Sequence, residues 1–235
     1  MLIFTVCPAA HAAGNVATAA VILMHGMGRT PRSMHKMERY LADRGYKTIN
    51  LGYPSTQADI ETISKRFLTP TVDRCRRQFP GASIHFVTHS LGGILVRQYL
   101  QNHSLPPGSR VVMLSPPNRG SEIADWLKDV FLYRWIMGPA GQQLGTSADC
   151  LPNRLRPVDV PVGIITGDAT LEPWFSLRLP GPDDGKVSVA RARLEEMADF
   201  LVVNKSHGFI MTNPQVMEQT AHFLAHGRFD HPRDS

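Results

Sequence analysis

The sequence Thr88-His89-Ser90-Leu91-Gly92-Gly93 places a serine where a short apolar stretch gives way to a helical pattern. On a sharp turn between a strand and a helix, a serine exposes its hydroxyl above the sheet and can act as a nucleophile. The turn is crowded, so the residues two before and two after the serine need small side chains. Gly92 meets this requirement, whereas Thr88 stands where glycine is usual. We predict that Ser90 is the nucleophile; the alternative is a serine that only caps a helix.

A second glycine-rich motif, His25-Gly26-Met27-Gly28, follows the first strongly apolar stretch. Glycines in such a loop let the backbone approach a reacting carbonyl group and direct an N–H group at it. An ordinary strand-to-helix turn is the alternative interpretation. In open α/β sheets, however, ligands bind beyond the carboxyl ends of the strands, where Ser90 is also expected to lie. The motif therefore predicts a loop that stabilises an oxyanion.

A nucleophilic serine needs a histidine as its base and an acid that orients the histidine. On an open α/β sheet these three residues follow the chain order serine, acid, histidine, so the base must lie late in the sequence. His222 and His226 are spaced as one face of the last helix, and His231 lies in the polar tail. His207, in Ser206-His207-Gly208, falls between an expected strand and an expected helix. We therefore predict that His207 is the base.

The acid that orients this histidine has two candidate positions. Asp168, in Thr166-Gly167-Asp168, follows the strand expected at residues 162–166, a common place for such an acid. Asp184 lies in Asp183-Asp184-Gly185-Lys186-Val187, where the glycine allows a tight loop that can hold a carboxylate against an imidazole. We favour Asp184, with Asp168 and Asp183 as alternatives; a solvated turn would also explain the run.

Short apolar stretches alternate with helical patterns, which is typical of an α/β fold with a mostly parallel central sheet and helices on both faces. Strands are expected at residues 20–24, 46–51, 83–88, 111–114, 162–166 and 201–203. Pro70 must kink or interrupt a helix that begins near residue 60, and a last helix is expected from residue 214 to about residue 226. We predict a single domain at residues 14–229, followed by a loose tail at residues 230–235.

The long connection at residues 118–161 is expected to form a small cap. It is rich in apolar and aromatic residues, and a second apolar group follows Asp168. Both segments leave carboxyl ends of strands, so we expect them to form the wall of an acyl pocket; the alternative is the core face of a helix. The residues predicted to contact the substrate are His25, His89, Trp126, Phe131, Trp135, Trp174 and Phe175.

The composition of the 235-residue chain, 43% hydrophobic and 19% charged, is that of an ordinary globular protein. Its net charge of +5 comes from scattered Lys and Arg residues without interleaved aromatic residues, so nucleic acid is not expected as a partner. Weak association with an anionic lipid surface is consistent with this charge. No apolar stretch is long enough to span a bilayer, and no Cys or His spacing is typical of a metal site.

The N-terminal segment differs from the rest of the chain. Apolar residues 2–6 are followed by Ala10-His11-Ala12, a small-x-small pattern that resembles a signal-peptide cleavage site, although the usual basic residues are missing. We expect residues 1–13 to be a signal-peptide remnant and the protein to be periplasmic or secreted, with a cytoplasmic location as the alternative. Cys75 and Cys150 would then remain as a pair able to form a disulfide.

The two glycine-rich motifs, the Asp-Gly-Lys-Val run and the late Ser-His-Gly resemble, over about residues 21–229, compact bacterial esterases and lipases of the α/β-hydrolase superfamily. This resemblance implies an α/β-hydrolase fold. It also implies that the N–H groups of Met27 and Leu91 form the oxyanion hole and that Asp184 is the acid of the triad. Thr88 is the main departure from the pattern.

These residues together predict a carboxylic ester hydrolase that acts through an acyl-enzyme intermediate and requires no cofactor or metal. The small cap favours acyl chains of about four to ten carbons, each methylene of which gains free energy in an apolar pocket. Amidases, thioesterases and acyltransferases form the same intermediate and remain alternatives. A catalytically silent binding protein on a hydrolase fold is a further alternative, but it would be expected to lack a triad residue.

Overall fold

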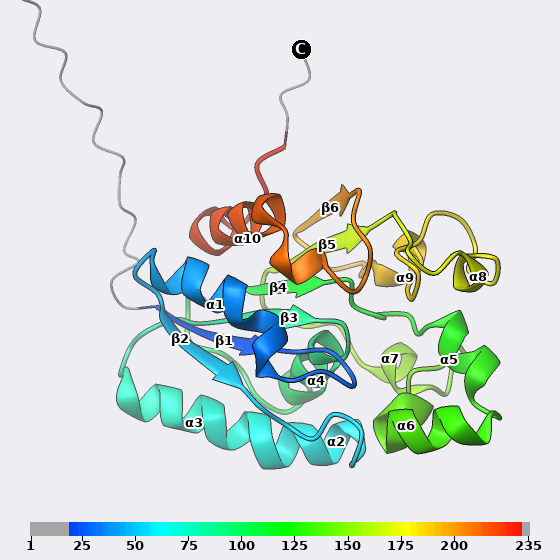
Figure 1. Ribbon diagram of the computed structural model, residues 1–235. Coiled ribbons are helices and arrows are strands. Elements are labelled where there is room, and N and C mark those ends of the chain that lie inside the picture. Colours follow the sequence, from blue (N-terminus) through cyan, green and yellow to red (C-terminus); the bar gives the residue numbers. More distant parts are fainter. Residues whose placement is uncertain (1–18, 232–235) are drawn as a thin grey trace, which may run out of the picture.

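The computed structural model describes residues 19–231, without the side chains of residues 132–134 (Figure 1). The predicted signal-peptide remnant at residues 1–13 lies outside the described residues, as do the last four residues of the predicted tail. The first two residues of that tail are held in place: Asp230 N–H donates to Gln219 Oε1 at 2.8 Å, and His231 contacts the Asp199 carboxylate at 2.8 Å.

One six-stranded sheet forms the centre of the molecule, in the order β2-β1-β3-β4-β5-β6, with every neighbouring pair parallel. This confirms the predicted α/β fold. The four central strands are buried along their whole length, which explains why they read as continuous apolar stretches. The strands are β1 (Ala20–Met24), β2 (Lys47–Leu51), β3 (Ile84–His89), β4 (Val111–Leu114), β5 (Val162–Gly167) and β6 (Asp199–Val203).

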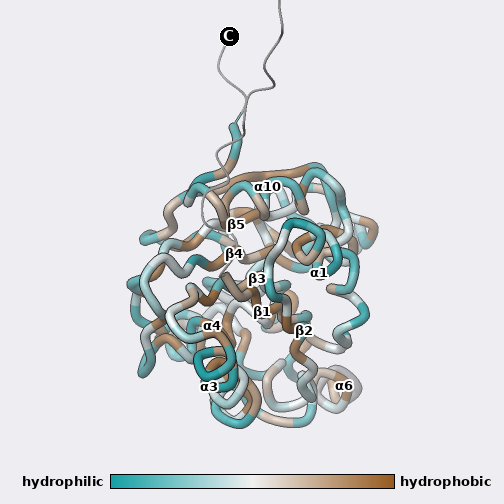
Figure 2. The backbone as a smooth tube through the Cα atoms, turned by 90° about the vertical axis from the view of Figure 1, so that its left-hand side faces the viewer, coloured by the Kyte–Doolittle hydropathy of each residue, from teal (hydrophilic) through white to brown (hydrophobic). Residues whose placement is uncertain are grey.

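Helices cover both faces of the sheet, as predicted, and Figure 2 shows the apolar strands between them. On one face lie α1 (His35–Ala42) and α10 (Pro214–His226); on the other lie α3 (Thr69–Gln78) and α4 (Leu91–Leu100). Side chains alternate along β1, so Val21 and Leu23 join the core under α1 and α10, whereas Ile22 and Met24 join the core under α4.

Pro70 is accommodated without a break in the helical path. The short helix α2 (Ile60–Ile63) continues into a π-helical turn at Ser64–Leu68, which leads directly into α3. The Thr69 N–H bonds to the Ser64 carbonyl in this wider turn, and Pro70 then occupies the first turn of α3, where its missing N–H is not needed.

Two connections lie at the carboxyl edge of the sheet. Residues 118–161 contain α5 (Glu122–Leu127), α6 (Phe131–Gln142) and α7 (Leu151–Arg154), and the β5–β6 connection contains α8 (Pro173–Ser176) and α9 (Val189–Ala192). Helix α6 is kinked at Gly138, which has φ 60°. A Cβ atom there would overlap the Thr56 carbonyl, so glycine allows α6 to dock beside the β2–α2 loop.

Cys75 and Cys150 do not form the disulfide that the sequence allowed. Cys75 is buried in the core on α3, whereas Cys150 precedes α7 and lies beside the Ser147 hydroxyl. Within residues 19–231, no helix is both long and apolar enough to cross a membrane.

Candidate active site

Ser90 occupies the tight turn between β3 and α4, with φ 51° and ψ −119°. Its N–H donates to the Leu114 carbonyl at 2.9 Å, which ties the turn to β4. A Cβ atom at Gly92 would lie 3.0 Å from Met24 Cβ and 3.2 Å from the His25 carbonyl oxygen, so a larger residue would crowd the turn. Thr88 is fully buried within β3 and is compatible with this geometry. The turn therefore has the strained conformation that exposes a nucleophilic hydroxyl.

His207 and Asp184 form a hydrogen-bonded pair at the same edge of the sheet, with a fully buried carboxylate and a partly exposed imidazole. The His207 Nδ1–H group donates to Asp184 Oδ2 at 2.8 Å, and the His207 backbone N–H donates to the Asp184 carbonyl at 2.9 Å. The two loops are thus joined through both side chain and backbone. The Asp184 bond fixes one ring nitrogen as the donor and leaves Nε2 free to accept a proton.

The environment of Asp184 favours its ionised form. Burial by itself would raise the pKa of this carboxyl, but the adjacent His207 ring and the hydrogen bonds to the carboxylate lower the pKa below 3.8. Its other oxygen accepts the N–H groups of Lys186 and Val187 at 3.1 and 2.9 Å. Asp184 is therefore a fixed carboxylate at neutral pH, suited to stabilise a positive imidazole.

The alternative acids face other partners. Asp183 accepts the Ser176 hydroxyl at 2.6 Å and the Gly185 N–H at 2.7 Å, and Asp168 accepts the Asn204 side-chain amide at 3.2 Å. Neither carboxylate bonds to His207. The alternative bases His222 and His226 pack against each other on α10, with ring centroids 4.4 Å apart. Of the candidates weighed, the structure brings Asp184 and His207 together.

His89 links the serine turn to the His207 loop. Its Nε2–H group donates to the His207 carbonyl at 3.0 Å, and the two ring centroids are 4.8 Å apart. Burial, together with the nearby His207 and Arg29 charges, keeps the pKa of His89 well below 6.5, so this ring stays neutral. Within the described chain, Ser90 Oγ makes no hydrogen bond to His207; in unliganded sites such bonds are often long and tighten only with substrate.

Hydrogen bonds to residues that follow β2 anchor the Met27 loop. The Tyr53 hydroxyl donates to the His25 carbonyl, and the Gly28 N–H donates to Ser55 Oγ at 3.0 Å. No hydrogen bond in the described residues uses the Met27 N–H. The Leu91 N–H is in the first turn of α4, where a helix has no acceptor for it. Both groups are available for an oxyanion.

His25 was predicted to contact the substrate, but it lies behind the loop. Its side chain is fully buried and stacks on Tyr53 with ring centroids 4.1 Å apart. It does not line the cavity next to Ser90. The ring supports the loop because its Nδ1–H group also donates to the Gly26 carbonyl at 2.9 Å.

Two glycines allow the loops to meet. A Cβ atom at Gly26 would lie 2.6 Å from His89 Nδ1, and one at Gly167 would overlap the Lys205 carbonyl and lie 3.0 Å from Asp184 Cβ. Gly167 ends β5 and was not singled out from the sequence, because nothing in Thr166-Gly167-Asp168 shows which later loop will cross it. The His89 ring at Gly26 and the Lys205 backbone at Gly167 come so close that neither position has room for a side chain.

A cavity of about 600 Å³ opens next to Ser90, His207, Asp184, His89 and Met27. This volume is in the usual range for a small-molecule site. Its wall is mostly apolar and comes from the two connections described above: Ile123, Ala124, Leu127, Met137, Leu144, Leu171, Phe175 and Val187. In the described residues, no group of three or more His, Cys, Asp or Glu side chains is arranged to hold a metal ion.

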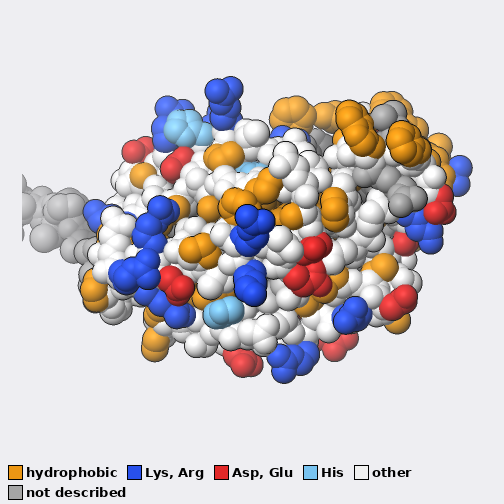
Figure 3. All heavy atoms as spheres, turned by 90° about the horizontal axis from the view of Figure 1, so that it is seen from below, with side chains coloured by type: hydrophobic (Ala, Val, Ile, Leu, Met, Phe, Trp, Pro, Cys, Tyr) orange, Lys and Arg blue, Asp and Glu red, His pale blue; other side chains and the backbone are white. Residues whose placement is uncertain are grey.

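Besides His25, four of the predicted substrate contacts are not in this cavity. Phe175 and His89 line it, whereas Trp126, Phe131, Trp135 and Trp174 do not and are 45%, 81%, 75% and 58% exposed. Phe131 and Trp135, four residues apart, share the solvent face of α6, while Met137 on another face lines the cavity. Figure 3 shows apolar side chains gathered at the α5–α6 end of the molecule.

Comparison with solved structures finds the same architecture in bacterial lipases. Lipase BlEst2 from Bacillus licheniformis in its mature form matches with a TM-score of 0.68 and 17% identity, over 89% of this chain and 93% of that chain. Its propeptide form matches with a TM-score of 0.71 and 20% identity over 93% of this chain; this chain spans 53% of it. The metagenomic carboxyl esterase MGS0156 matches with a TM-score of 0.61 and 18% identity, over 82% and 65% of the two chains.

The sheet order, the serine turn and these structural neighbours define an α/β-hydrolase fold. No protein-family model matches the chain, and no curated protein matches its sequence. Similarity at 17–20% identity establishes the fold alone, because one fold hosts many unrelated functions.

Proposed function

We propose that the protein is a serine hydrolase that cleaves carboxylic esters. One observation carries the proposal: Ser90 on its strained turn and the His207–Asp184 pair, 2.8 Å apart, open into the same apolar cavity. A serine, an oriented imidazole and a buried carboxylate are the groups that acyl transfer requires. Hydrolysis of nitrophenyl esters by the purified chain is the first test. Failure to cleave these esters at every acyl-chain length would contradict the proposal.

The reaction begins when Ser90 Oγ attacks the ester carbonyl carbon while His207 Nε2 removes the serine proton. The N–H groups of Met27 and Leu91 bind the resulting oxyanion, and each such donor contributes about 2.7–4 kcal/mol to transition-state stabilisation. His207 then protonates the leaving alcohol, which leaves an acyl group on Ser90. Water, activated by His207, attacks this acyl group and frees the acid and the serine. Asp184 stabilises the imidazolium in both steps.

The apolar wall supports a preference for short to medium acyl chains. Each methylene buried against Leu127 and Leu144 gains about 0.8 kcal/mol, about fourfold in kcat/KM, until the cavity is full. We expect kcat/KM for nitrophenyl esters to rise from acetate to a maximum between about four and ten carbons. Leu127→Ala should lower the octanoate-to-acetate ratio about three- to tenfold, because it removes part of the wall.

The control for this experiment is Trp135→Ala, which changes a large aromatic residue outside the cavity. It should keep the wild-type octanoate-to-acetate ratio. Equal kcat/KM for acetate and octanoate in the wild type would contradict an acyl pocket at this place. A ratio that responds to Trp135 but not to Leu127 would place the acyl chain on the outer face of α6 instead.

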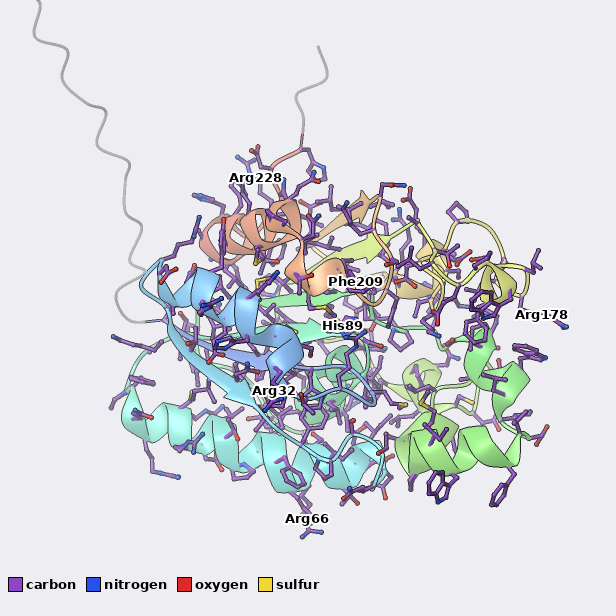
Figure 4. The ribbon with its side chains drawn as sticks, in the orientation of Figure 1. Arg32, Arg66, His89, Arg178, Phe209 and Arg228 are labelled. Carbon is purple, nitrogen blue, oxygen red and sulfur yellow. The ribbon has the colours of Figure 1, made fainter. Side chains whose placement is uncertain are left out.

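We also propose that the apolar residues beside the cavity mouth contact a lipid surface. This apolar rim consists of Trp126, Val130, Phe131, Trp135, Ile136, Leu171, Trp174 and Leu177, all at least 45% exposed. Its α5 and α8 parts meet where the Trp126 and Phe175 rings lie 6.1 Å apart. Exposed Arg178 lies over the Trp126 ring at 4.9 Å and projects at the α8 end (Figure 4). Aromatic residues flanked by a cation suit an anionic bilayer interface.

The double variant Phe131→Ser, Trp135→Ser should weaken binding to phosphatidylcholine vesicles that contain phosphatidylglycerol, an anionic lipid that attracts a protein surface carrying cations. Cosedimentation of the full chain should show at least a fivefold loss, because two large apolar groups leave the interface. Val202→Ser, which changes an apolar residue that is 39% exposed on β6, serves as control and should bind as the wild type does. Equal cosedimentation of all three proteins would rule out the rim as the contact.

A further inference from the structure

Arg29 is a charged residue of the cavity wall that the proposed reaction does not use. It follows the Met27 loop, and its backbone N–H donates to the Gly26 carbonyl at 3.2 Å. Its guanidinium lies over Gly208, because a Cβ atom at Gly208 would be 3.2 Å from Arg29 Nη2. Gly208 directly follows the base, so a positive charge stands next to the His207 side of the cavity.

This charge has no acidic partner among the described residues. Ion pairs there involve other cations, and none includes Arg29. Lys186, which also lines the cavity, is neutralised by Glu172 at 2.9 Å, and the Asp184 carboxylate is paired with His207. The wall thus presents one uncompensated guanidinium, whose planar donors match a carboxylate or phosphate.

The position of Arg29 decides which part of an ester it would meet. His207 protonates the leaving oxygen, so the alcohol portion must pass next to His207 and Gly208. The apolar residues Ile123 and Leu127 lie on α5, within the connection at residues 118–161. Their part of the cavity wall suits the acyl portion. Phe209, the next residue after Gly208, also lines the cavity and is labelled in Figure 4.

We infer that the natural substrate is an ester whose alcohol portion carries an anionic group, a carboxylate or a phosphate, and that Arg29 binds this group. The inference rests on the proposed ester hydrolysis and specifies its substrate class. A charge-assisted hydrogen bond in a partly enclosed cavity is worth about tenfold in kcat/KM. It weakens with added salt because the mouth is open to solvent.

The test compares three butyryl esters of phenols that differ in the para substituent: a carboxylate, a phosphate and an uncharged methyl carboxylate. For wild type, Arg29→Ala, Arg29→Lys and Arg32→Ala, kcat/KM is measured for each ester. Arg29→Ala should lower the ratio of charged to uncharged ester about tenfold, and Arg29→Lys should lower it less. Arg32 is the matched control: it is exposed and has no acidic partner in the described residues, but it does not line the cavity.

The ratio for the carboxylate and the ratio for the phosphate show which anion Arg29 prefers. A ratio that Arg29→Ala leaves unchanged for both anions overturns the inference, as does an equal effect of Arg32→Ala. Calorimetric binding of 4-hydroxybenzoate and phenyl phosphate to wild type and Arg29→Ala separates the two proposals. Binding that depends on Arg29 without turnover of any ester would keep the anion site and contradict ester hydrolysis; turnover without such binding or ratio change would do the reverse.

Discussion

Replacing Ser90 with alanine is expected to lower kcat for ester hydrolysis by about five to six orders of magnitude, the loss typical of a removed nucleophile in a serine triad. The expected loss is this large because the proposed acyl intermediate forms on the Ser90 hydroxyl. Residual turnover would come only from binding and from the Met27 and Leu91 N–H groups. The hydroxyl makes no hydrogen bond within the described residues, so its removal should leave the thermal unfolding midpoint within about 2 °C of wild type.

Ser206→Ala is the matched control for this prediction. Ser206 also lines the cavity and directly precedes the base, but it is not on the β3–α4 turn. Its replacement should lower kcat less than about tenfold, since no covalent step depends on it. A loss at Ser206 comparable to that at Ser90 would show that the attacking hydroxyl has been misassigned.

Asp184→Asn is expected to lower kcat by about four orders of magnitude, the loss typical of a serine triad whose acid is replaced by an amide. The neutral amide can no longer stabilise the imidazolium and favours the wrong tautomer of His207. The fold should survive, because the asparagine carbonyl can still accept the Lys186 and Val187 N–H groups that now bond to Asp184 Oδ1. Single-turnover kinetics with a nitrophenyl ester measure the acylation step directly.

Asp168→Asn is the control, because Asp168 bonds to Asn204 and not to His207. We expect it to change kcat less than about threefold, as for a polar surface group. A severe loss in Asp168→Asn with a mild one in Asp184→Asn would move the acid to the end of β5 and contradict the present assignment.

The convergence of the Ser90, Asp184 and His207 loops could be predicted from the sequence because parallel strands align their carboxyl ends. Once residues 20–24, 83–88 and 162–166 are assigned to one parallel sheet, the loops that follow them must converge. The observed β1, β3 and β5 agree with these ranges within one residue at either end. Chain order then selects His207 from the late histidines, since His222 and His226 belong to the closing helix.

The apolar wall of the cavity could not be predicted in the same way. The face of α6 that meets the cavity depends on how the helix docks, and its kink at Gly138 rests against Thr56, far away in the sequence. The aromatic residues of this segment were therefore assigned to the pocket by composition, while Leu127 and Met137 form it. The place of Arg29 in the cavity wall could not be predicted either, because only the fold of the His207 loop shows that the Arg29 guanidinium lies over Gly208.

Covalent labelling tests most directly whether Ser90 is a nucleophile activated within this site. The full chain is incubated with a fluorophosphonate, whose phosphorus bonds to an activated serine oxygen as fluoride leaves, and the product is analysed by intact mass and peptide mapping. We predict one adduct per chain, on Ser90 of Thr88-His89-Ser90-Leu91, and much slower labelling in His207→Ala. An adduct on another serine, or labelling that persists in Ser90→Ala, would contradict the account.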